Sequence, residues 1–159
     1  MAFNFFKKKP EKSEVGPSKL VMNPVDYHPK IVLAWSKAIE GNKEILEWLS
    51  KNGFEELAVA CWAIRLNDEA RSWLLQNGYP QLMAFINAAE GNESALKWLE
   101  KYNMQVYLHM AKAIDGEIDS YYWLQKNTTP DVFMLTKSIE RVKDEIEENN
   151  NDPHRISPD

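Results

Sequence analysis

Hydrophobic positions recur along this chain with a fixed period. Trp48, Trp73, Trp98 and Trp123 stand 25 residues apart, and a leucine follows each of them. A constant interval of this size is typical of a stacked array in which every unit is one supersecondary element. The pattern therefore predicts a repeat region that extends from about residue 30 to residue 140.

Each unit divides into two predicted helices. The first half is apolar almost all round, as in residues 57–61 (LAVAC), which suits a helix enclosed between neighbours. The second half is amphipathic and carries the tryptophan. Gly41-Asn42 and Gly91-Asn92 separate the halves, because glycine permits positive φ where a helix ends and asparagine caps the next start. Pro80 and Pro130 suit the first turn of the following helix.

Such units bury their apolar faces only by stacking on one another. We expect an all-α fold, a short curved solenoid of four to five stacked helix-turn-helix repeats over residues 21–145, with five inner and four outer helices. Residues 1–20 hold Pro10, Gly16 and Pro17 and show no period, so they predict a flexible N-terminal arm. Residues 146–159 predict a disordered acidic and polar tail.

The repeated pattern is A-x-x-G-N-x-E-x-L-x-W-L-x-x-N-G, with matching stretches at 38–53, 63–78, 88–103 and 113–128. It resembles the helix pair of ankyrin repeats, which implies a protein-binding function. Ankyrin units run about 33 residues, whereas these run 25. We therefore expect an ankyrin-like array with short loops in place of the projecting β-turns, and a generic α-hairpin solenoid is the competing class. Without those β-turns, no ankyrin binding residue can be carried over.

Composition narrows the function classes. The net charge of −5 over 159 residues disfavours nucleic-acid binding, which needs a basic stripe. The single cysteine, Cys61, excludes an intrachain disulfide and fits a reducing compartment. No apolar run reaches the roughly 18 residues that a membrane span needs, so we expect a cytoplasmic protein.

Candidate binding residues lie on the first helix of each unit. Positions 15, 11 and 8 before the tryptophan share one helical face, and their common order is apolar, then Lys or Asn, then acid. The second unit breaks this order with Trp62 and Arg65, a composition typical of binding hot spots. We predict that these two anchor a partner in a concave groove lined by other residues of the same face: Leu33, Lys37, Met83, Asn87 and Leu108.

The alternative interpretation of this pair is structural. Trp62 would cover a local gap, and Arg65 would pair with Glu40 and Glu90 of the adjacent units. His109 falls in an otherwise apolar column, so we expect a hydrogen-bonded core histidine rather than a ligand.

The sequence thus predicts a monomeric, non-enzymatic protein-protein interaction module that binds a protein or peptide. We expect no catalytic residue, no cofactor and no metal, because His28, His109 and His154 lie far apart. One alternative is a peripheral membrane adaptor that uses three phenylalanines followed by three lysines in residues 3–9. Another, by analogy alone, is an inhibitor or immunity-type protein.

Overall fold

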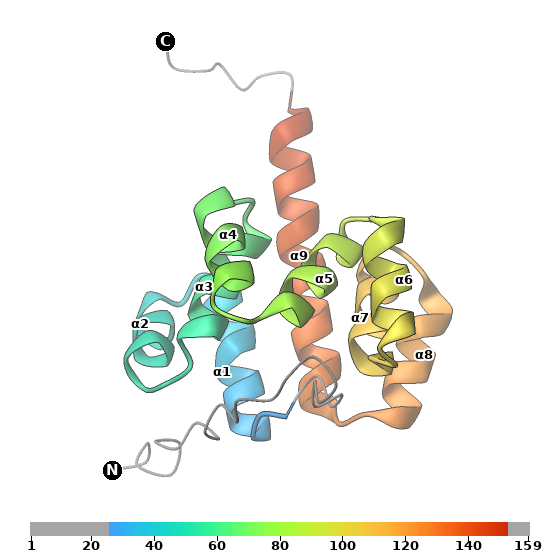
Figure 1. Ribbon diagram of the computed structural model, residues 1–159, viewed down its shortest axis with the longest axis horizontal. Helices are drawn as coiled ribbons and strands as arrows, with labels where there is room; N and C mark the ends of the chain where they lie inside the picture. The colour runs from blue at the N-terminus through green and yellow to red at the C-terminus, as the bar shows by residue number, and fades with distance from the viewer. Residues whose placement is uncertain (1–25, 153–159) are drawn as a thin grey trace.

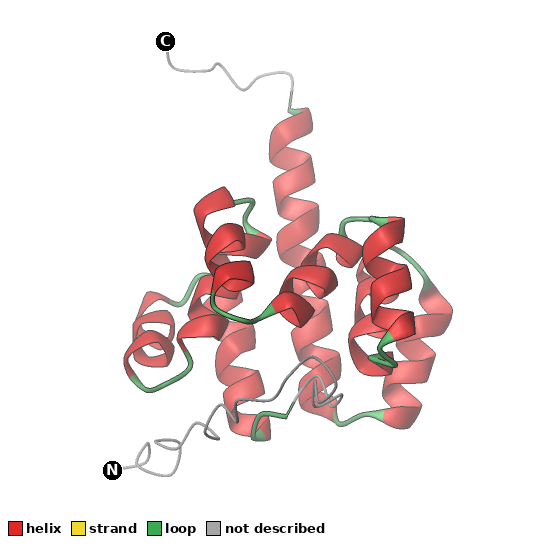
Figure 2. Cartoon of the chain, viewed as in Figure 1, coloured by secondary structure: helices red, strands yellow, loops and turns green. Residues whose placement is uncertain are grey.

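The computed structural model describes residues 26–152, and this part of the chain is helical without strands (Figures 1 and 2). The predicted N-terminal arm and its membrane role lie outside the described residues. The helices are α1 (Pro29–Ile39), α2 (Lys43–Lys51), α3 (Glu55–Ile64), α4 (Asp68–Gln76), α5 (Pro80–Ala89), α6 (Glu93–Lys101), α7 (Gln105–Ile114), α8 (Ile118–Asn127) and α9 (Pro130–Asn151).

The helices confirm the division of each unit into an inner and an outer helix. Helices α1, α3, α5 and α7 are the inner helices, α2, α4, α6 and α8 the outer ones, and α9 is a fifth inner helix. Neighbouring helices pack in sequence order. The side chains of Asn42, Asn67 and Asn92 each accept a hydrogen bond from the backbone N–H three residues on, so they cap α2, α4 and α6 as predicted.

The buried anchor of each outer helix is the leucine rather than the tryptophan. Leu49, Leu74, Leu99 and Leu124 are 0% exposed. The four repeated tryptophans are half-buried and cover the edge of the core. The outer helices are therefore held by a leucine that fills the interior, and the tryptophan ring extends that apolar contact to the surface.

The inner helices enclose a core of three layers. Each layer takes one residue from every inner helix, at positions 16, 13 and 9 before the repeated tryptophan, and each of these side chains is 7% exposed or less. The lower layer is Val32, Leu57, Leu82, Tyr107 and Val132; the middle one is Trp35, Ala60, Phe85, Met110 and Leu135; the upper one is Ile39, Ile64, Ala89, Ile114 and Ile139.

The two ends of the array meet. Helices α1 and α9 lie side by side (Figure 1) and form the most extensive contact between any two of the described helices. The predicted curved solenoid with a concave face is therefore not confirmed, because the contact of α1 with α9 closes the array into a ring. The inner helices instead enclose the three core layers, with the residues at positions 16, 13 and 9 before the tryptophan turned inwards.

The closing contact has the register of an ordinary contact between repeats. Glu40 accepts hydrogen bonds from Ser138 and Arg141, both at 2.6 Å. Gly91 is the equivalent of Arg141 two repeats earlier, and Asp115 is the equivalent of Glu40 three repeats later. A Cβ at Gly91 would lie 3.6 Å from the Asp115 carboxylate, so these two positions are neighbours as well. Helix α9 therefore contacts α1 in the same register in which α5 contacts α7.

Small side chains let α1 and α9 approach closely. Ser36 and Ser138 have Oγ atoms 2.6 Å apart and are 3% and 1% exposed. Because Ser138 donates its hydroxyl hydrogen to Glu40, Ser36 donates to Ser138. The Ser138 hydroxyl, and then Lys37 and Arg141, hold the pKa of the Glu40 carboxyl below its usual range. The closure is therefore a hydrogen-bonded contact as well as an apolar one.

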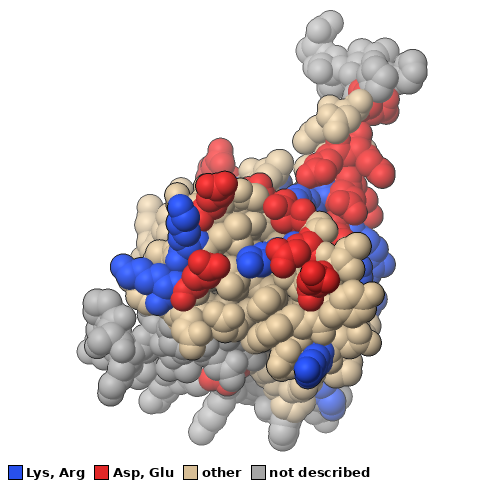
Figure 3. Space-filling model, turned by 90° about the vertical axis from the view of Figure 1, so that its right-hand side faces the viewer, with Lys and Arg blue, Asp and Glu red and all other residues tan. Residues whose placement is uncertain are grey.

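The sequence predicts a disordered tail from residue 146, but the chain is helical to Asn151. Helix α9 continues to Asn151, because its residues 140–151 contain no glycine or proline that would end it, and Val142 and Ile146 still contact the core. Beyond the ring the helix projects from the body, and acidic side chains gather along it (Figure 3). Of the predicted tail, residues 153–159 lie outside the described part of the chain.

One loop carries backbone strain that a substitution should relieve. Leu66 has φ 68°, where the other units place Gly41, Gly91 and Gly116. A leucine with positive φ costs on the order of 1–3 kcal/mol, which exceeds the entropy that glycine loses. We expect Leu66→Gly to raise the free energy of unfolding by about 1 kcal/mol in urea denaturation. Gly41→Ala is the matched control and should lower it, since a Cβ there meets no atom within 4 Å and reports backbone strain alone.

Candidate functional site

The same groove recurs between successive units. It is formed by the inner and outer helices of one unit and by the inner helix of the next. We number the grooves one to four along the chain: the first lies between α1–α2 and α3, the fourth between α7–α8 and α9. The sequence pattern placed the residues 11 and 8 before the tryptophan on one concave face. Two of these pairs instead line separate grooves, Trp62 and Arg65 in the first and Lys137 and Glu140 in the fourth.

The second groove is filled from inside by an arginine. Arg71 forms an ion pair with Glu90 of the next unit, and its guanidinium also donates to the backbone oxygen of Ala63 at 3.0 and 3.1 Å. The same side chain approaches the Asn87 side-chain oxygen at 3.5 Å. The arginine is only 19% exposed. The arginine side chain therefore occupies the second groove.

The fourth groove is lined by an aromatic ring and stays open, with a volume of about 300 Å³. Tyr121 is the equivalent of Arg71 two repeats later. Its hydroxyl donates to Glu140 at 2.8 Å, and its ring packs edge-on against Phe133. The ammonium of Lys137 lies 3.8 Å from the centre of the tyrosine ring and also pairs with Glu140 at 3.0 Å. Burial and the Glu140 carboxylate raise the pKa of the Tyr121 hydroxyl, so the phenol stays a hydrogen-bond donor.

The first groove has neither an arginine nor a tyrosine at this position. Leu46 stands where the second and fourth grooves have Arg71 and Tyr121, and its side chain is shorter. The groove is an open space of about 200 Å³, lined by Leu46, Trp62, Arg65 and, in addition, Ala38, Gly41, Lys43 and Cys61. Trp62 is 51% exposed, so about half of a large apolar surface faces solvent at this point.

Trp62 forms a ridge between two hollows. On its other side it lines a shallow depression on the surface of the second unit, with Val59 and Trp73 among its walls. An indole that borders both hollows offers its exposed surface to a partner that occupies either of them. Trp62 and the first groove are therefore the candidate site.

The structure brings only part of the predicted set to this site. Trp62 and Arg65 are exposed and line the first groove. Met83 and Leu108 are 5% and 4% exposed and belong to the core. The remaining three predicted residues are accessible but lie elsewhere: Leu33 and Lys37 on α1, and half-buried Asn87 in the second groove.

The predicted ion pairs of Arg65 do not form. Arg65 donates to the backbone oxygen of Ile39 at 2.8 Å. Glu40 is held by α9 and by Lys37, the latter at 3.1 Å, and Glu90 is held by Arg71. The alternative interpretation, in which Arg65 joins Glu40 and Glu90, is therefore wrong in its pairing.

Sequence reasoning missed the residue that separates the grooves. Position 2 before the tryptophan reads Leu46, Arg71, Leu96 and Tyr121, and it supplies a polar contact in the second and the fourth groove. The signal was present, because Arg71 in a mostly apolar column is followed one unit later by the carboxylate that it pairs with. A comparison of exceptional residues between two repeat positions, rather than within a single position, would have identified this pair.

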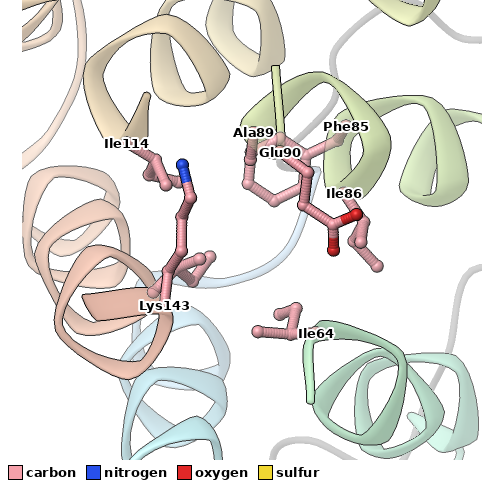
Figure 4. A pocket seen from close by; sticks show the side chains of 8 residues that line it. Ile64, Phe85, Ile86, Ala89, Glu90, Ile114 and Lys143 are labelled. Atoms are coloured by element: carbon pink, nitrogen blue, oxygen red, sulfur yellow. The ribbon is translucent and has the colours of Figure 1, made fainter. Parts of the chain in front are cut away.

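The pit at the centre of the ring is too small to be a site. It opens at the upper layer of the core, with Glu90 and Lys143 at its rim (Figure 4). Its volume of about 20 Å³ admits about one water molecule. The Lys143 ammonium pairs with Asp115 at 3.2 Å.

The remaining reactive groups have structural surroundings. Burial raises the pKa of the Cys61 thiol to about 12, and its sulfur lies 3.2 Å from the Leu57 carbonyl oxygen. Burial also raises the pKa of Tyr107. Within residues 26–152 no group of three or more His, Cys, Asp or Glu side chains is arranged to hold a metal ion.

His109 is the titratable group that should couple stability to pH near neutrality. Its ring stacks on Trp123 with centroids 3.9 Å apart, and Nδ1 lies 3.2 Å from the Ser120 hydroxyl. Because Ser120 donates to Glu117, the histidine carries its proton on Nδ1 and donates to Ser120. Burial, then the Lys112 charge, lowers the pKa of this imidazole in the folded protein.

This lowered pKa gives a signed prediction. The pKa of histidine in an unfolded chain is about 6.5. Below that pH the unfolded chain binds more protons at His109 than the folded chain does. The contribution of His109 is therefore complete above about pH 6.5 and is lost as the pH falls towards the folded pKa. We expect the stability measured by urea denaturation to fall between about pH 7.5 and 5.5, and the His109→Gln variant to show a smaller fall. An unchanged pH slope in that variant would contradict this assignment.

Comparison with known proteins gives no family for this chain. No family model, no curated protein and no solved structure matches it. The resemblance to ankyrin repeats stays a prediction. Among residues 26–152, the structure contains no helix long and apolar enough to cross a membrane.

Proposed function

We propose that this chain is a non-enzymatic protein-binding module, a closed ring of ankyrin-like helix pairs that takes a segment of a partner protein into its first groove. The observation that carries the proposal is the half-exposed Trp62 beside an open groove, in a fold whose second groove holds an internal ion pair and whose fourth groove holds a hydrogen bond from a tyrosine to a carboxylate. An exposed tryptophan with an arginine one turn away is the composition that dominates binding energy in protein interfaces.

The scaffold supports this function. The groove is made by three helices whose core residues are buried, and Asn42 caps the start of α2 at its edge. A preformed groove loses little conformational entropy on binding, which favours affinity. We propose a monomer that works in the cytoplasm, and the single buried thiol of Cys61 supports a reducing compartment.

The test is affinity capture from the lysate of the source cell with matched variants. Trp62→Ala combined with Arg65→Glu alters the first groove, whereas Tyr122→Ala removes a ring that is 66% exposed at the fourth groove. Both should keep the helical content in circular dichroism. A partner that binds wild type and Tyr122→Ala but not the double variant supports the proposal. A partner retained by all three would place the binding surface elsewhere.

A second variant fills the groove instead of removing its wall. Leu46→Arg, Trp62→Asn and Arg65→Glu together copy Arg71, Asn87 and Glu90 into the equivalent positions. The new arginine and glutamate can pair as they do in the second groove, so the variant should fold. We expect it to lose the partner as completely as the double variant does.

A further inference from the structure

The residue 8 before the tryptophan shows what each groove requires. In four of the five units it is an acid, and each acid meets a donor from a neighbouring helix. The pairs are Glu40 with Arg141, Glu90 with Arg71, Asp115 with Lys143, and Glu140 with the Tyr121 hydroxyl. A carboxylate held across the boundary between two units is thus a repeated feature of this ring.

The second unit reverses the charge at this position. Arg65 replaces the acid, and its guanidinium contacts the Ile39 carbonyl with one of its nitrogens. Lys43 lines the same groove. Within the described part of the chain, neither cation forms an ion pair, and Glu40 is held by α9 on the other side of α1. The first groove therefore presents two positive charges and no carboxylate that neutralises them.

The apolar part of the first groove lacks the aromatic ring that lines the fourth groove. There, the Tyr121 ring lies with its centroid 5.5 Å from that of Phe133 and under the Lys137 ammonium. In the first groove, Leu46 and Ala58 are smaller than their counterparts Tyr121 and Phe133. The opening of about 200 Å³ is below the roughly 300–1,000 Å³ of small-molecule sites and suits one or two inserted side chains.

We infer that the first groove binds a partner segment in which an acidic side chain lies next to an aromatic or large aliphatic one. The inference rests on the proposed function and names the chemistry of its ligand. The carboxylate pairs with Arg65 and Lys43, and the apolar side chain packs between Trp62 and Leu46. Arginine binds carboxylates through two parallel hydrogen bonds, which fixes the orientation of the bound segment. The ligand supplies from outside what Tyr121 and Glu140 supply within the fourth groove.

The experiment selects peptides from a random library displayed on phage, with the full-length chain as the target. We expect enrichment of Phe, Trp or Leu within a few positions of Asp or Glu. The enriched peptide is then synthesised and titrated by calorimetry against the wild type, Trp62→Ala, and the charge-reversed variant Lys43→Glu/Arg65→Glu. We expect at least a tenfold loss of affinity for each variant, and weaker binding to wild type as salt rises.

A swap of charge makes the test specific. The same peptide with Lys in place of its acids should bind the charge-reversed variant at least tenfold more tightly than it binds wild type. Enriched peptides without acids, or peptides that bind the charge-reversed variant as well as wild type, would overturn the inference, as would a library that shows no enrichment. Capture of a lysate partner that depends on Trp62 would then still support the proposed function. Loss of Trp62 dependence in that capture would overturn both.

Discussion

Deletion of residues 130–159 is expected to abolish the cooperative unfolding transition. The deletion removes α9 and with it four buried apolar side chains, Val132, Leu135, Ile139 and Val142. At about 1.5–3 kcal/mol each, their burial contributes about 6–12 kcal/mol, which is comparable with the whole stability of an ordinary domain. The deletion also exposes the face of α1 that packs on α9. In an open array, loss of the last helix would remove only one interface.

Urea denaturation followed by far-ultraviolet circular dichroism measures this effect. The control is a chain that stops after Glu147, which keeps the buried residues of α9 and the half-buried Ile146 but removes the end of the acidic projection. Its free energy of unfolding should lie within about 0.5 kcal/mol of wild type. A cooperative transition near the wild-type midpoint after deletion of residues 130–159 would show that the contact of α1 with α9 does not hold the fold together.

Replacement of Trp35 by alanine is expected to lower the free energy of unfolding by about 3–5 kcal/mol. Trp35 is 0% exposed and is the largest side chain in the middle layer of the core, where Ala60 on the neighbouring inner helix is too small to fill the space it would leave. Trp62 is the matched control, because it is the same residue type at 51% exposure. Trp62→Ala should change the stability by no more than about 0.5 kcal/mol.

Equilibrium denaturation of the two variants side by side separates the core from the binding surface. An equal loss of stability in both variants would mean that Trp62 has a structural role. The first groove would then no longer be supported as a binding site. If only Trp35→Ala loses stability, a role in folding does not explain the large side chain of Trp62.

The local structure could be predicted from the sequence because its determinants are local. The 25-residue period, the asparagine caps and the prolines at helix starts act within a few residues of one another. They gave the number and order of the helices. The continuation of α9 was missed because an acidic, polar sequence such as residues 143–151 is as typical of a solvated helix as of a disordered tail.

The closure of the ring depends on geometry that accumulates over five units. A small change in the rotation between neighbouring repeats decides whether α1 meets α9, and no single residue encodes that rotation. Two residues did point to it: Ser36 and Ser138 are small and polar in columns that belong to the core. For the site, the odd pair Trp62 and Arg65 could be identified, but not its wall, because the helix faces were assigned for an open array.

A ring also fixes the number of its parts. Open arrays can change length when a gene segment is duplicated or lost, since a new unit only adds another neighbour. Here an extra 25-residue unit would separate Ser138 from Glu40, and a missing one would leave them unable to meet without distortion of every other boundary. The order of the chain is less constrained than its length. A gene rearranged to join the present termini by a linker, and to begin instead at the exposed turn of Asn77 and Gly78, would encode the same set of contacts.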